Sequence, residues 1–384
     1  MKKRTNIKEV KIMKKVIMTL FLVALSVVLM HGYADATVAG VCSDCHTMHN
    51  SQNNSPMNYD GVTTAPEDNL LRGDCLGCHG QGNADNLEGS SNTIPQVLHT
   101  AGTDLAGGNF GYLTGVKTLG TGGTTLNAGH NVIDISVTDT VNTTPPGDEN
   151  ATGITNANFT CAGQYGCHGD RTATSNFAAV SGGHHADDSV LKFGTISEAG
   201  QGSTTALSYR FLKGVKGGED DDWEATVSAS DHNEYKGATA GVEGNITTPG
   251  GGTISGLCSE CHGNFHGAAA DIGGPTGTPW ERHPTDISLP NTGGYADYNV
   301  DGQGATDPGE YNPLVPVARV TIPNASTATV TESGTDNDIV MCLSCHRAHA
   351  SPYADMLRFE YTMSAGVSND DFGCFVCHTD KNAD

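Results

Sequence analysis

Apolar residues follow no sustained helical or strand period along most of this 384-residue chain. Glycine, threonine, asparagine, serine and aspartate are abundant, and glycine clusters at 107–108, 120–123 and 250–252 predict turns and loops. A helix or strand that packs on a core normally shows a periodic apolar face. The pattern therefore predicts a chain that is mostly coil, with a few short strands.

One segment departs from this pattern, the apolar run from Val16 to Met30. Seven basic residues lie in the first fifteen positions, and a small-x-small sequence ends at Ala36. These are the features of a secretory signal peptide, which we expect over residues 1–36. Fifteen residues are short for a membrane span. The mature chain, 37–384, is expected to be secreted as a single domain with no membrane span.

The mature chain is strongly acidic. Removing the signal takes seven basic and two acidic residues from the 20 and 43 of the full chain, which leaves 13 and 41 and a formal charge of −28. Nucleic acid is excluded as a partner, because phosphate binding requires positive charge. The charge suits a surface that attracts cations or basic proteins.

All twelve cysteines fall into six pairs, and a histidine directly follows the second cysteine of each pair. The sequence C-x-x-C-H attaches a c-type haem: the two thiols bond to the porphyrin, and the histidine is the proximal ligand of the iron. Six covalently attached c-type haems are therefore predicted, at Cys42, Cys45 and His46; Cys75, Cys78 and His79; Cys161, Cys167 and His168; Cys258, Cys261 and His262; Cys342, Cys345 and His346; and Cys374, Cys377 and His378.

The third pair differs from the others, because five residues rather than two separate Cys161 from Cys167. A disulfide is the alternative at this pair. The retained Cys167-His168 step favours haem, and Gly163 and Gly166 would let the longer loop bulge away from the ring. A zinc ribbon is the alternative for the other five pairs, but it would leave their trailing histidines unexplained.

Six porphyrins change what the weak apolar pattern implies. Alone, such a sequence would bury too little apolar surface to offset its conformational entropy. Six large apolar plates fixed to the chain would supply the core. We therefore expect a haem-stack core wrapped by coil, with short helices at the motifs. The gaps of 33, 86, 97, 84 and 32 residues between first cysteines place paired sites at both ends and two widely spaced sites between them.

The mature chain has nine further histidines, which is more than six distal ligands require. His49 and His349 follow their own motifs by three residues, so they would reach a neighbouring iron rather than their own. The pair His184-His185 would serve two haems, or one haem with a spare. His232 and His266 rank lowest. The predicted distal set is His49, His99, His130, His184, His185, His283 and His349.

An iron with two histidine ligands has no open position for a substrate, so it transfers electrons. The surplus of histidines and the absence of a C-x-x-C-K motif favour an electron conduit over an enzyme. The alternative is a multihaem reductase that keeps one iron open. A haem-bearing structural surface protein has no positive sign in the sequence.

The segments 42–51 and 341–351 resemble the first and fifth haem segments of the OmcS-type hexahaem cytochromes of metal-reducing bacteria. Shorter similarities occur at 107–111, 129–132 and 282–284. The resemblance implies an extracellular or cell-surface protein, with the periplasm as second choice. It also implies a filament with a continuous stack of haems. The implied electron acceptors are redox proteins, metal oxides or other cells.

The same resemblance gives His49 a role, because the family uses this histidine to bind a haem of the adjacent subunit. It implies a homopolymer joined through His49, with the fifth haem as its target. The third site departs from the family in its spacing and in lacking a trailing histidine, for which the pair His184-His185 is the candidate replacement.

Overall fold

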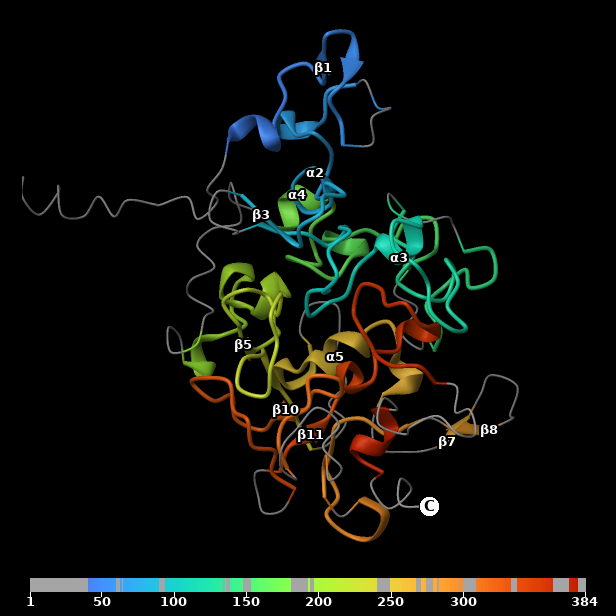
Figure 1. Ribbon diagram of the computed structural model, residues 1–384, viewed down its shortest axis with the longest axis vertical. Helices are drawn as coiled ribbons and strands as arrows, with labels where there is room; N and C mark the ends of the chain where they lie inside the picture. Colours follow the sequence, from blue (N-terminus) through green and yellow to red (C-terminus); the bar gives the residue numbers. More distant parts are fainter. Residues whose placement is uncertain are drawn as a thin grey trace, which may run out of the picture. The chain divides into compact units, whose positions relative to one another are not determined.

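Loops make up most of the chain in the computed structural model, and the regular elements are short (Figure 1). The structure describes residues 41–59, 63, 65–89, 94–133, 135, 139–147, 153–180, 193, 197–239, 249–266, 271–273, 279–281, 283–295, 297–299, 309–332, 337–361 and 373–378. These residues lie in one unit, 37–384. The predicted signal peptide lies outside them.

Four α-helices of four or five residues occur in the described part: α2 (Leu76–His79), α3 (Gly111–Thr114), α4 (Asn176–Ala179) and α5 (Ile254–Cys258). Side-chain oxygens cap two of them, because Ser175 accepts from the N–H of Ala178 at α4 and Thr253 from that of Gly256 at α5. The 3-10 turns are η1 (Cys42–Asp44), η2 (Asp68–Leu70), η3 (Gly163–Tyr165), η6 (Glu198–Gly200), η7 (Thr205–Leu207), η8 (Tyr209–Phe211), η9 (Gly250–Gly252), η10 (Gly263–Phe265), η11 (Gly293–Tyr295), η12 (Cys342–Ser344), η13 (Ala354–Met356) and η15 (Gly373–Val376).

Each of the six cysteine motifs contains part of a short helix or 3-10 turn, as predicted. The elements involved are η1, α2, η3, α5, η12 and η15. Within the described residues, no helix is long and apolar enough to cross a membrane.

The largest sheet has five strands in the order β5-β6-β10-β11-β9. Its neighbours pair antiparallel except β6 and β10, which are parallel and join Tyr235 to Ala318. Three further pairs are two-stranded: β1-β2, β3-β4 and β7-β8. The strands are β1 (Ser51–Gln52), β2 (Ser55–Pro56), β3 (Leu87–Glu88), β4 (Ile94–Pro95), β5 (Gly217–Gly218), β6 (Glu234–Lys236), β7 (Asp271–Gly273), β8 (Pro279–Glu281), β9 (Ile287–Ser288), β10 (Ala318–Arg319) and β11 (Ile339–Val340).

Buried apolar side chains form three separate clusters rather than one core. One surrounds Tyr235 and Ile339 of the five-stranded sheet, a second surrounds Tyr298 and Tyr311, and a third surrounds Phe110. Cysteines of the motifs pack against all three. The third, fifth and sixth attachment sites therefore border the apolar clusters.

Candidate haem sites

A continuous cavity of about 2140 Å³ runs past cysteines of all six motifs and is lined by five of the six predicted proximal histidines. His130, His283 and His349 of the predicted distal set also line it. Single ligand pockets are roughly 300–1,000 Å³. The cavity is therefore large enough for several flat, apolar groups side by side.

The backbone of each motif forms the same tight turn. In the second motif, the N–H groups of Cys78 and His79 both donate to the carbonyl of Cys75, at 3.2 and 2.9 Å. The same two bonds, from the second cysteine and the histidine to the first cysteine, recur at all six sites. This turn sets both thiols and the imidazole in one fixed relation.

The third motif keeps these bonds despite its longer spacing. Cys167 and His168 donate to the carbonyl of Cys161 at 3.2 and 3.0 Å, while the intervening residues form the excursion η3. A Cβ at Gly166 would lie 2.4 Å from the backbone nitrogen of Ala162, so the loop requires glycine there. Both cysteines are free thiols. The site therefore keeps the two backbone hydrogen bonds of its five counterparts, and a haem there stays a prediction.

The proximal imidazoles are oriented by backbone carbonyls. The Nδ1 atoms of five of them, His46, His79, His168, His262 and His346, lie 3.2, 2.9, 3.0, 2.7 and 2.7 Å from the carbonyl oxygens of Asn69, Pro95, Arg210, Pro146 and Asp355 respectively. A carbonyl can only accept, so Nδ1 carries the hydrogen and Nε2 keeps its lone pair. Metal-bound histidines are held in this way.

The first, third and fifth sites share a backbone feature that the sequence reasoning missed. Two consecutive residues with positive φ provide the acceptor carbonyls, one for the imidazole and one for the N–H of the residue after it. A leucine and then a basic residue follow. We call these segments the left-handed turns: Asn69-Leu70-Leu71-Arg72, Arg210-Phe211-Leu212-Lys213 and Asp355-Met356-Leu357-Arg358. The repeated Leu-Arg/Lys step was the available signal.

Three predicted distal histidines face proximal ones. The ring centres of His168 and His349 are 6.2 Å apart, and those of His262 and His130 are 6.1 Å apart. The rings of His378 and His283 are also separated by 6.1 Å. A metal–nitrogen bond of about 2 Å on each side places two ligating imidazole centres about 6.2 Å apart. Each pair is therefore spaced to hold one iron.

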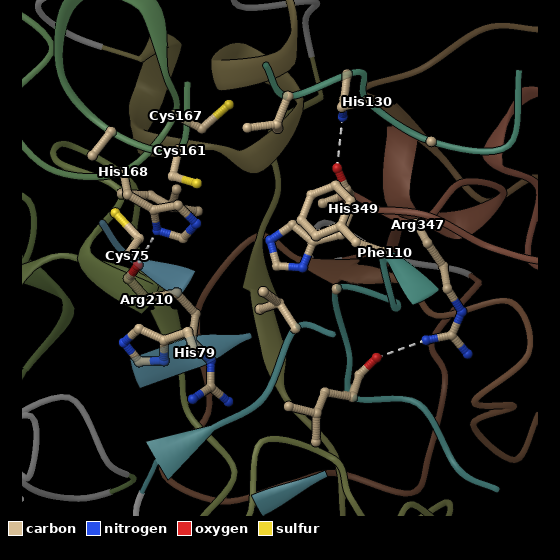
Figure 2. Close-up of a pocket in the computed structure, with 18 of the residues that line it drawn as sticks. Cys75, His79, Phe110, His130, Cys161, Cys167, His168, Arg210, Arg347 and His349 are labelled. Carbon is tan, nitrogen blue, oxygen red and sulfur yellow. Dashed lines mark hydrogen bonds between the residues drawn. The ribbon is translucent and has the colours of Figure 1, made fainter. Parts of the chain in front are cut away.

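The close-up shows how one such pair is arranged (Figure 2). His349 lies between His168 and His130, and Phe110 stacks on it with the ring centres 5.0 Å apart. Burial, reinforced by neighbouring imidazoles, lowers the pKa of His349 to about 3 and that of His130 to about 4. Both rings are therefore neutral at pH 7, the form that binds a metal.

The remaining members of the distal set fall in three environments. His49 is exposed at the end of the first motif. His99 is fully buried, and neither of its ring nitrogens has a hydrogen-bond partner among the described residues, although it does not line the cavity. His184 and His185 lie outside the described residues. Opposite His346, the described residues place no second imidazole.

The two histidines ranked lowest make contacts of another kind. His232 stacks on Tyr311 with ring centres 3.5 Å apart and lies 3.4 Å from the carboxylate of Glu234. His266 lies 2.9 Å from the carboxylate of Asp286, and both are buried. Neither lines the cavity. These two rings take part in buried polar networks of the protein.

Neighbouring motifs meet through their thiols, which gives an order in space. The side chain of Cys45 interacts with that of Cys78, that of Cys75 with that of Cys161, and that of Cys258 with that of Cys342. Cys345 interacts electrostatically with Cys374. The third and fourth motifs are joined by the buried ion pair of Arg171 and Glu260, with 2.8 Å between nitrogen and oxygen. The six sites thus follow one another in sequence order.

These features together fit c-type haem. The six motifs share one pattern of backbone hydrogen bonds, and three pairs of imidazole rings leave the space of one metal ion between them. Fully buried ring nitrogens of His99 that lack a partner are those expected of a ligand seen without its metal. Haem bound here would supply the redox iron, and the chain would fix its axial ligands and exclude water.

Comparison with known proteins agrees with this chemistry. Residues 336–383 match the family of the doubled CXXCH motif. The chain is similar to the C-type cytochrome OmcS of Geobacter sulfurreducens, with 28% identity over 397 residues that cover 89% of this chain and 83% of OmcS.

Two solved structures are also similar, each over 85% of both chains. One is the cryo-EM structure of the OmcS nanowires from Geobacter sulfurreducens, with 23% identity and a TM-score of 0.44. The other is the Outer Membrane Cytochrome S filament from the same organism, with 21% identity and a TM-score of 0.40. The sequence similarity to OmcS confirms the predicted resemblance, and the structure confirms a chain that is mostly coil with short helices and a few short strands.

Proposed function

We propose that this chain is an electron-transfer cytochrome that carries six covalently attached c-type haems and passes electrons along them. The observation that carries the proposal is the spacing of the three histidine pairs, 6.1 to 6.2 Å between ring centres. Each pair would close both axial positions of an iron. Closed irons exchange electrons and bind no substrate.

A conduit also requires neighbouring haems to lie close together. The thiol contacts between successive motifs support this, because each thiol would bond to the edge of its own porphyrin. The single cavity that passes all six motifs supports it as well. Electrons would enter at one end of this series and leave at the other.

The competing function is a reductase with one open iron. Electron paramagnetic resonance of the ferric protein and carbon monoxide binding to the ferrous protein separate the two. The conduit predicts six low-spin irons and no stoichiometric carbon monoxide adduct. One high-spin iron that binds carbon monoxide would establish the reductase instead. Mass spectrometry of the mature chain counts the haems, and five rather than six would remove the third site from the proposal.

We further propose that copies of the chain join through His49 into a filament. His49 is exposed. Three apolar side chains beside the first motif are also exposed: Val41 (67%), Met48 (72%) and Leu70 (46%). An exposed apolar surface of this kind suits contact with another protein chain. The described part places no second imidazole opposite His346, so the fifth iron could accept a ligand from another copy. OmcS, to which this chain is similar, forms nanowires.

Electron microscopy of the purified protein tests this assembly. The variant His49→Ala should keep all its haems and form no filaments, because the shared ligand is lost. Gln52→Ala, an exposed change three residues away, should polymerise normally. Normal filaments from His49→Ala would refute the assignment.

We propose that the protein acts outside the cytoplasm, at the cell surface or beyond it, and the predicted signal peptide and the acidic mature chain support this location. Its acceptors would be redox proteins, metal oxides or other cells. Fractionation of cells and detection of the haem protein in the medium or on the surface would test this. Recovery only from the periplasm would contradict it.

A further inference from the structure

The three left-handed turns end in a basic residue at the same structural position, but in three different environments. Arg72 at the first site is partly exposed. Lys213 at the third site pairs with Asp170, with 2.6 Å between nitrogen and oxygen. Arg358 at the fifth site is 7% exposed and has no carboxylate partner among the described residues. The basic side chain of these turns is therefore screened by solvent at the first site and paired with a carboxylate at the third. At the fifth site it is buried without a carboxylate partner.

Arg358 is fixed directly behind the fifth attachment turn. Its backbone N–H donates to the carbonyl of Cys345 at 2.8 Å, as that of Arg72 does to Cys45. Its Nε donates to the carbonyls of Leu343 and His346 at 2.7 and 3.2 Å. Its Nη2 is buried without a hydrogen-bond partner. The guanidinium thus lies against the loop that holds the proximal ligand.

Other buried arginines of the described part have acidic partners. Arg171 pairs with Glu260, and Arg319 pairs with both Glu234 and Asp338. A buried charge without a counter-charge is costly, and arginine cannot lose its proton. Arg358 therefore keeps its positive charge in a site where solvent screens it little.

The nearby charges do not cancel it. Arg347 adds a second positive group that lines the cavity and donates to the carbonyl of Leu105 at 2.9 Å. The side chain of Asp355 is exposed to solvent. The carboxylates of Asp104 and Glu224 interact with Arg347 and offset part of its charge. Arg358 forms no ion pair with a described carboxylate and contacts the carbonyls of the attachment turn directly, so its charge is the one left unpaired beside the fifth site.

A positive charge near a haem changes its reduction potential in one direction only. Reduction lowers the charge of a haem iron by one, so a nearby positive charge stabilises the reduced state and raises the reduction potential. At an effective dielectric constant of about 20 and a separation of about 10 Å, one charge changes the ratio of reduced to oxidised haem about tenfold. A tenfold change is about 59 mV for a one-electron couple.

We propose that Arg358 makes the haem held by Cys342, Cys345 and His346 the most oxidising of the three whose sites contain a left-handed turn. This rests on the proposed electron-transfer function. Of these three haems the fifth would hold an electron most strongly, and it is the one that His49 of another copy is proposed to bind. Arg358 acts through charge on the potential of this haem and is a tuning residue.

Spectroelectrochemical titration of the haem-loaded protein tests this with three variants. Arg358→Gln should lower one of the six one-electron steps, by about tenfold in reduced-to-oxidised ratio. Arg358→Lys keeps the charge and loses the planar set of carbonyl bonds, so its titration should match the wild type. Arg72→Gln, at the equivalent exposed position, should leave that step unchanged.

The outcomes separate a charge effect from a structural one. If both Arg358 variants leave the titration unchanged, or if both shift it equally, the inference is overturned. Should Arg358→Gln lose haem, Arg358→Met is the second neutral variant: a step that is lowered in Arg358→Met and unchanged in Arg358→Lys supports the inference, and equal behaviour of the two variants overturns it. Failure of the electron-transfer function would appear separately, as a high-spin iron or a missing haem mass in the wild type.

Discussion

The buried ion pair between Arg171 and Glu260 joins the third attachment site to the fourth. The guanidinium binds both carboxylate oxygens, at 3.0 and 2.8 Å, and both side chains are 3% exposed. Arg171 stands three residues after His168, where the first and fifth motifs have histidines. Removing one partner of such a pair costs about 3–5 kcal/mol, because the other is left buried and unpaired.

Arg171→Met should therefore lower the urea midpoint of unfolding by about 1–2 M. Burial raises the pKa of Glu260 to about 7. The neutral side chain of Glu260 stabilises the folded protein at low pH, and this stabilisation is lost as the pH rises through its pKa. The variant should thus lose more stability at pH 8 than at pH 5.

Urea titration followed by the haem Soret band, at both pH values, measures this loss. The double variant Arg171→Met/Glu260→Leu should recover most of it, since an apolar pair of similar volume has no charge to desolvate. A single variant as stable as the wild type would refute the role of the ion pair. So would a double variant as unstable as the single one.

Three further predictions concern individual sites. His349→Ala should convert one haem of six to a high-spin form that binds carbon monoxide, whereas His232→Ala should create none. Gly166→Ala should lose one haem, measured as a lower mass of the chain, because the new Cβ would lie 2.4 Å from the backbone nitrogen of Ala162. The control Gly102→Ala, where no atom lies within 4 Å of the new Cβ, should retain every haem. Burial, with a shared hydrogen bond, raises the pKa of Asp220 to about 7, so this carboxyl should contribute to a fall in stability as the pH rises from about 4 to 7. An Asp220→Asn variant should show a weaker pH dependence than the wild type in urea titrations, and Glu260 should account for part of what is left.

The sequence contained the chemistry of the sites because covalent attachment needs fixed residue types at fixed spacing. Coil with short helical turns followed from the lack of apolar periodicity, and the structure confirms it. The pairing of His168 with His349 could not be read from the chain, since 181 residues separate them and loops between them have no period. His184 and His185 were the sequence candidates at the third site, but they lie outside the described residues.

Backbone acceptors were equally hidden from the sequence. The carbonyls of Pro95 and Pro146 orient His79 and His262, yet a carbonyl exists at every residue and leaves no signature. The left-handed turns left a clearer trace in the sequence, because the step Leu-Arg or Leu-Lys recurs near three motifs. Recognising them requires the positive φ angles, which asparagine tolerates but methionine and phenylalanine rarely adopt.

The central claim is a series of six irons, each closed by two histidines. A high-resolution structure of the haem-loaded protein tests it most directly. We expect six haems in sequence order, with an iron between the rings of His168 and His349, of His262 and His130, and of His378 and His283. An iron at any of these sites with water or an empty position opposite its proximal histidine would contradict it.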